Sequence, residues 1–131
     1  MKKDNVNHPA HYKPLFVMRP LECIDITEHL DFCRGCAFKY VWRAGQKGDK
    51  AKMIEDLQKA AWYMERFFNN SYDRGGGPWN ARMLFERIEK PESGDLRRKY
   101  DILQNIVSFS ALAQGQIEAW IRDLKKEGGK K

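Results

Sequence analysis

The sequence predicts an all-α fold, a compact helical bundle with an extended N-terminal arm and a long C-terminal helix or broken helix pair. Apolar residues recur at spacings of three and four over long stretches, which is the period of an amphipathic helix. No stretch alternates apolar and polar residues as a half-buried strand does. The 131 residues, 42% of them hydrophobic, suffice for one core without disulfides. We therefore expect a single domain over residues 1–131.

The chain is expected to begin with an arm and a short helix. Residues 1–19 contain Pro9 and Pro14 and lack a sustained period, so they are expected to be extended. Pro20 suits the first turn of a helix, and the apolar residues that follow it predict a helix that ends near Leu30.

Two longer helices are expected next. The first covers residues 33–44 and stops at Gly45, because glycine readily takes the conformation that ends a helix. Asp49 is a good N-cap for the second, whose apolar spacing continues to Phe67 and Phe68. The stop at Gly45 and the cap at Asp49 are both local signals, whereas Gly35 makes the start of the first of these helices less definite.

The C-terminal half begins with a breaker-rich loop and a short helix within residues 69–94. Two apolar stripes then run through residues 95–126, which predicts one long helix or two helices broken near Gly115. One stripe would face the core and the other a second copy of the chain. We therefore expect a homo-oligomer through this segment, with residues 127–131 as a basic tail.

The net charge of +6 lies mostly at the chain ends. Residues 125–131 hold four lysines and one glutamate, and residues 2–4 hold two lysines and one aspartate. Nucleic acid is therefore not the expected partner, although DNA binding through the tail stays open as an alternative. No apolar run reaches the roughly 18 residues of a membrane span, and residues 1–11 lack a signal-peptide core. A membrane partner is not expected either.

The arm carries the first candidate site residues, His8, His11, Tyr12 and Lys13. They offer hydrogen-bond donors, a stacking ring and a cation within one short stretch, which suits a nucleotide phosphate or base edge. The alternative is a polar arm with two exposed histidines.

The helix predicted over residues 33–44 carries the second group. Lys39 and Arg43 share a helix face with Lys47 just beyond its end, and such cations can bind a phosphate. Trp42 and Tyr40 could stack on a base. The alternative is a solvated basic face beside core aromatics. No glycine-rich P-loop motif is present.

Carboxylates and cysteines suggest metal sites. Asp25, Glu55 and Asp56 lie on two predicted helices and could hold Mg²⁺, although an exposed amphipathic helix shows the same spacing. Cys33 and Cys36 form a CxxC pair that would need two further ligands for structural zinc, such as the arm histidines. A single CxxC pair is a weak signal, and we do not expect zinc.

Several motifs occur in order, namely NHPAHYK, ECID, FCRGCAFKYVWRAGQK and EDLQKAAWY. Residues 5–68 that contain them resemble the small phage-encoded nucleotide kinase family. The resemblance implies phosphorylation of deoxynucleoside monophosphates such as dTMP and dGMP from ATP with Mg²⁺, in the cytoplasm of an infected bacterium. Cys36 departs from the asparagine usual in that motif, and residues 14–20 differ from the family's shorter link.

The resemblance also assigns roles. It implies a catalytic role for Lys39, Arg43 and His11. It implies nucleotide binding by His8, Tyr12, Trp42, Lys47 and Lys59, to which the composition of the arm adds Lys13, and it also favours Asp56 as a site residue.

A fainter similarity links residues 54–63 to the all-α nucleotide pyrophosphatases of the MazG type. Lys59 stands where that family has a metal-binding aspartate, which would disrupt the metal site because a cation repels the metal. The alternatives to a kinase are therefore a relative of those pyrophosphatases, or a non-catalytic protein that sequesters nucleotides or cyclic nucleotides during infection.

Overall fold

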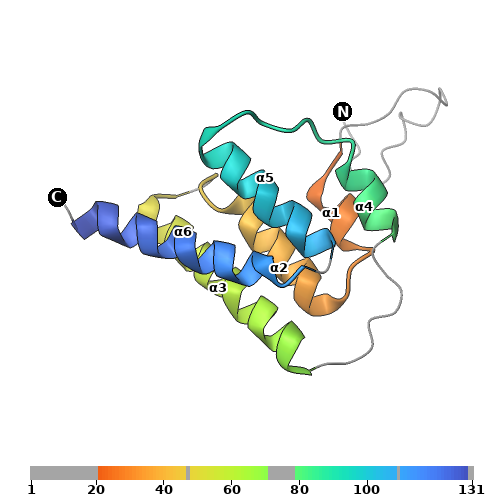
Figure 1. The fold of residues 1–131 in the computed structure, drawn as a ribbon, viewed down its shortest axis with the longest axis horizontal. Helices are drawn as coiled ribbons and strands as arrows, with labels where there is room; N and C mark the ends of the chain where they lie inside the picture. The colour runs from red at the N-terminus through yellow and green to blue at the C-terminus, as the bar shows by residue number, and fades with distance from the viewer. Residues whose placement is uncertain (1–20, 47, 71–78, 109, 130–131) are drawn as a thin grey trace, which may run out of the picture.

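The computed structural model describes residues 21–46, 48–70, 79–108 and 110–129 of the chain. These residues form helices without any strand, which confirms the all-α prediction (Figure 1). The helices are α1 (Cys23–Thr27), α2 (Phe32–Arg43), α3 (Lys50–Asn70), α4 (Trp79–Phe85), α5 (Gly94–Val107) and α6 (Leu112–Gly129). The predicted arm lies outside the described residues.

The helix α2 is central to the bundle, since it packs against α1, α3 and α5. The helix α6 lies along α3 and also contacts α5, and α4 contacts α1 and α5 (Figure 1). One cluster of buried side chains joins all six of these helices. Its largest fully buried apolar members are Trp120, Phe38, Ile26, Leu57, Met64, Ile102, Ile106 and Ile117. No helix among the described residues is long and apolar enough to cross a membrane.

Local signals set the ends of α2 and α3. Asp31 caps α2, where its carboxylate accepts a hydrogen bond from the Arg34 backbone N–H. Gly45 follows α2 with a φ of 86°, a left-handed conformation that suits glycine. The Asp49 carboxylate accepts a hydrogen bond from the Lys52 N–H at 3.0 Å. The predicted stop and the predicted N-cap are therefore confirmed.

The C-terminal segment is a broken pair, but the break lies at residues 108–111 and not near Gly115. The Ser108 hydroxyl donates to the Gln104 carbonyl at 2.7 Å, and the Ser110 hydroxyl accepts from the Leu112 N–H at 3.1 Å. Serine side chains compete with the helix for backbone partners in this way. The expected break near Gly115 is wrong, because glycine only weakens a helix, whereas the Ser110 hydroxyl binds a backbone N–H at the start of a new one, as a capping side chain does.

Because of this break, most residues of both apolar stripes are buried within one chain, although Leu96 at the start of α5 is exposed. The buried residues are Ile102, Leu103, Ile106, Val107, Ala113, Ile117, Trp120, Ile121 and Leu124. The helix α6 folds back across α5 and α3, so neither stripe is left as the spare face that the sequence suggested. A homo-oligomer therefore stays a prediction without that support.

Replacing Gly115 by alanine is expected to stabilise the protein by about 0.5–1 kcal/mol, because Gly115 lies inside α6. A Cβ at this position meets nothing within 4 Å, so no packing cost offsets the gain. Urea unfolding followed by circular dichroism measures the change. A lower midpoint would show that Gly115 does not lie in a helix interior.

Candidate functional site

The antiparallel helices α2 and α3 share one exposed face. Phe32 at the start of α2 contacts Tyr63 near the end of α3, with ring centroids 5.9 Å apart. At the other end, Arg43 Nη2 lies 3.4 Å from Asp56 Oδ1. We call this surface the α2–α3 face, and it consists of Phe32, Lys39, Tyr40, Arg43, Lys52, Glu55, Asp56, Lys59, Trp62 and Tyr63.

Three cations surround the Tyr40 ring. The Nζ atoms of Lys39 and Lys59 lie 4.8 Å and 5.4 Å from its centroid, and Arg43 Cζ lies 5.2 Å from it. The negative face of an aromatic ring attracts cations at such distances. We call Lys39, Tyr40, Arg43 and Lys59 the Tyr40 cluster. It holds three positive charges, from two helices, within 5.4 Å of the centroid of one ring.

Two carboxylates partly balance these charges. Asp56 is only 1% exposed, and its Oδ1 lies 3.3 Å from Lys52 Nζ as well as close to Arg43. Glu55 lies 3.4 Å from Lys59 Nζ. No carboxylate among the described residues pairs with Lys39. With Lys52 included, four cations face two carboxylates, so the α2–α3 face has an excess of two positive charges and attracts anions.

Aromatic rings continue from the Tyr40 cluster. Tyr40 stacks on Tyr63 with centroids 6.1 Å apart and an interplanar angle of 10°. Phe32 and Trp62 each meet the Tyr63 ring edge-on, and these two residues are 73% and 55% exposed. Burial raises the pKa of the Tyr63 hydroxyl, and the Cys36 thiol beside it adds to the rise. The face thus offers exposed rings next to clustered cations.

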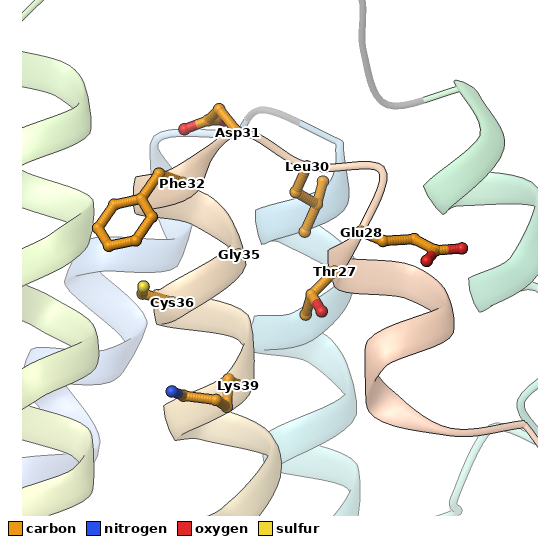
Figure 2. Close-up of a pocket in the computed structure, with 8 residues that line it drawn as sticks. All are labelled: Thr27, Glu28, Leu30, Asp31, Phe32, Gly35, Cys36 and Lys39. Atoms are coloured by element: carbon orange, nitrogen blue, oxygen red, sulfur yellow. The ribbon is translucent and has the colours of Figure 1, made fainter. Parts of the chain in front are cut away.

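A cavity of about 340 Å³ adjoins the cluster, which is within the range of small-molecule sites (Figure 2). Phe32, Cys36 and Lys39 project from α2 toward α3, whereas Thr27 and Glu28 come from the end of α1. Gly35 lets α2 approach the end of α1 closely, because a Cβ at this position would lie 3.4 Å from the Thr27 carbonyl oxygen. Lys39 belongs both to the cavity and to the Tyr40 cluster.

Burial raises the pKa of the Cys23 thiol from 9.0 to about 11, and Lys39 partly opposes this rise. The folded protein therefore keeps a proton that the unfolded chain loses, so stability should fall as the pH rises from 9 to 11. Urea midpoints across this range are expected to fall more steeply for the wild type than for Cys23→Ala. Equal slopes for the two proteins would contradict the assignment.

The structure brings together six of the residues singled out from the sequence, which are Lys39, Tyr40, Arg43, Glu55, Asp56 and Lys59. The remaining candidates on the arm and after α2, His8, His11, Tyr12, Lys13 and Lys47, lie outside the described residues.

Trp42 lies on a different side of α2. It contacts Phe38, with centroids 5.7 Å apart, and lines a second cavity of about 180 Å³ together with Lys99 and Tyr100. The Lys99 ammonium donates to the Trp42 carbonyl oxygen at 2.7 Å, and burial lowers the pKa of this lysine. The structure therefore separates Trp42 from the Tyr40 cluster, and Tyr40 is the aromatic residue among the cations.

The carboxylates predicted to hold Mg²⁺ are not brought together. Asp25 lies in α1, where it accepts a hydrogen bond from the Glu22 N–H at 2.8 Å, and α1 does not contact α3. Asp56 is paired with Arg43 and Lys52 instead. Across the described part of the chain, no group of three or more His, Cys, Asp or Glu side chains could hold a metal ion.

Sequence reasoning missed four members of the face, which are Phe32, Lys52, Trp62 and Tyr63. The spacing of Lys52 and Asp56, four residues apart on one helix, is a signal for an ion pair. Nothing local marks Phe32 or Tyr63, because their exposure and mutual contact depend on how α2 and α3 pack.

Comparison with known proteins gives two matches. Residues 6–65 match a family model described as a protein of unknown function (DUF3310). The Gene 1.7 protein of Enterobacteria phage T3 is 38% identical over 69 residues, which cover 50% of this chain and 42% of that protein. The chain thus spans less than half the length of that phage protein. No solved structure matches the chain.

These matches correct the family resemblance drawn from the motifs. The stretch that resembled nucleotide kinases matches a family of unknown function, so the identification as a kinase family, and with it the fainter likeness to MazG-type pyrophosphatases, is wrong. The motif residues also have structural roles that need no shared activity. Tyr40 and Tyr63 stack between α2 and α3, and Arg43 pairs with Asp56 across the same contact.

Proposed function

We propose that the Tyr40 cluster and the cavity beside it bind a nucleotide. The observation that carries the proposal is the Tyr40 cluster, in which three cations from two helices surround one ring. Neighbouring lysine and arginine side chains bind phosphate oxygens, and an arginine does so through two parallel hydrogen bonds. The excess of positive charge on the face favours a phosphate ester over a neutral ligand.

The cavity beside the cluster gives the rest of a nucleotide a place. With the phosphate at Lys39 and Arg43, a sugar and base extend along α2 past Cys36 toward Phe32, on the side that faces α3 (Figure 2). The exposed Phe32 ring offers a stacking surface for the base.

The reaction we propose at this site is phosphoryl transfer from ATP to a deoxynucleoside monophosphate. Such transfer depends mainly on positioning and on stabilising the charge of the phosphoryl group, which Lys39, Arg43 and Lys59 are placed to do. The described carboxylates do not fit a magnesium site, since Asp56 is already paired and Asp25 lies on α1. The proposed transfer therefore does not use a metal held by Asp25 or Asp56.

Sequestration without chemistry is the second candidate function. It is favoured by the pairing of both carboxylates of the face, Glu55 with Lys59 and Asp56 with Arg43 and Lys52. Neither is left free to act as a general base. A protein that only holds the nucleotide needs nothing more than the cations and the cavity.

We also propose that the protein is encoded by a phage and acts in the cytoplasm of the infected host. The similarity to a protein of Enterobacteria phage T3 supports this origin. Residues 6–65, which match the family model, contain the α2–α3 face.

A binding and turnover experiment tests the function. Calorimetry with ATP and with each deoxynucleoside monophosphate measures binding, and chromatography of the same mixtures with Mg²⁺ detects ADP and a diphosphate product. Binding with product supports the kinase, and binding without product supports sequestration. Absence of binding by every nucleotide would overturn the proposal.

A further inference from the structure

The α2–α3 face is longer than one nucleotide requires. Beyond Lys59, the exposed strip of α3 continues through Trp62 to Arg66, whose Cζ lies 5.8 Å from the Trp62 ring. No carboxylate among the described residues pairs with Arg66. Trp62 does not line the cavity, although its ring meets the Tyr63 ring edge-on. The Trp62 ring and the Arg66 guanidinium therefore have no part in binding the first nucleotide.

We infer that this face takes a single-stranded oligonucleotide of at least two nucleotides, with Trp62 as a second stacking platform. The first nucleotide occupies the Tyr40 cluster and the cavity. The next base stacks on the exposed Trp62 ring, and Lys59 and Arg66 flank the phosphate between the two. The inference rests on the proposed function in sharing Lys59, but it has its own residues in Trp62 and Arg66.

The alternation of rings and cations favours a single strand over a duplex. Exposed aromatic side chains bind unpaired bases through their flat faces, and neighbouring cations follow the backbone. From Phe32 to Arg43, α2 extends about 16 Å at 1.5 Å per residue, so the face is long enough for more than one base. The net charge of the sequence does not point to this surface, because most of the positive excess lies at the two ends of the chain.

The experiment compares ligands that differ only in length or in bases. Calorimetry measures the binding of dTMP, of thymidylate oligomers of two and four nucleotides, and of a four-nucleotide abasic strand with the same phosphates. The wild type is expected to bind the oligomers at least about 5-fold more tightly than dTMP, in line with one additional stacked base. The abasic strand should not share this gain.

Variants assign the gain to the second platform. Trp62→Ala is expected to weaken oligomer binding by about 5- to 150-fold and to leave dTMP binding unchanged. Arg66→Gln should weaken oligomer binding and reduce its salt dependence. Trp79→Ala is the matched control, because Trp79 is 66% exposed on α4, which does not contact α3. It should change nothing.

The outcomes separate this inference from the proposed function. If dTMP binds and the oligomers bind no more tightly, the second platform is wrong and nucleotide binding stands. If the oligomers bind through Trp62 but no mononucleotide binds, the inference stands and the proposed function fails. Equal binding of the abasic and thymidylate strands would reduce the interaction to charge and would also overturn the inference.

Discussion

Replacing Arg43 by glutamine is expected to weaken nucleotide binding by about 10- to 150-fold. Arg43 is the member of the Tyr40 cluster that can donate two hydrogen bonds to one phosphate, and a hydrogen bond to a charged group contributes about 1.5–3 kcal/mol. If the protein is a kinase, turnover should fall at least as much, because the same charge stabilises the transferring phosphoryl group.

The glutamine substitution is expected to leave the fold intact. Glutamine retains a donor for the Asp56 carboxylate, which Lys52 Nζ also approaches at 3.3 Å. The matched control is Arg97→Gln, which removes an arginine of similar exposure that pairs with Asp101 on α5. The control should bind nucleotide as the wild type does, and circular dichroism should show the same helix content for all three proteins. Wild-type affinity in Arg43→Gln would remove the arginine from the site.

The helices of the site were predictable because their signals are local. The Asp49 cap and the Gly45 stop depend on residues within one turn of the backbone. The spacing of the apolar residues in α3 indicates which side of that helix is buried. Lys39 and Arg43 lie four residues apart, so their shared face followed from the helix period alone. These properties depend on neighbours in sequence and not on the packing of the bundle.

The partners of the site residues were not predictable in the same way. The sequence placed Asp56 in a metal site and Trp42 in a stacking site, because carboxylates and indoles have those uses. Their actual contacts depend on which helix packs on which side of α2. Asp56 meets Arg43 across the α2–α3 contact, and Trp42 faces Lys99 of α5. Long-range pairing of this kind leaves no trace in helix periodicity.

The position of the break between α5 and α6 was predicted wrongly for a related reason. The apolar spacing runs through it almost without change, so periodicity left open one continuous helix or a break near Gly115. The Ser110 hydroxyl accepts a hydrogen bond from the Leu112 N–H at the start of α6, and the Ser108 hydroxyl donates to the Gln104 carbonyl oxygen in the last turn of α5. Sequence composition shows the serines but not the backbone groups that they bind.

The second large effect is expected from Asp56, the buried carboxylate between α2 and α3. Replacing both of its cationic partners, in the double variant Arg43→Met with Lys52→Met, should destabilise the protein by about 3–5 kcal/mol, because a charge at a 1% exposed position is left without a partner. Adding Asp56→Leu should restore most of the lost stability, since an apolar group of similar size replaces a buried ion pair at little cost. Urea unfolding of the three proteins measures both steps.

The same variants also distinguish two roles for the Asp56 carboxylate, which are holding Arg43 and Lys52 in place and binding Mg²⁺. If Asp56 serves to hold Arg43 and Lys52 in place, the triple variant is folded but does not bind nucleotide, because its cations are gone. If Asp56 were a magnesium ligand, millimolar Mg²⁺ alone would raise the melting temperature of the wild type and not that of Asp56→Asn. Equal melting temperatures with and without Mg²⁺, together with recovery in the triple variant, would assign the carboxylate to positioning the phosphate-binding cations. Failure of Asp56→Leu to recover stability would show that the pair itself holds α2 against α3.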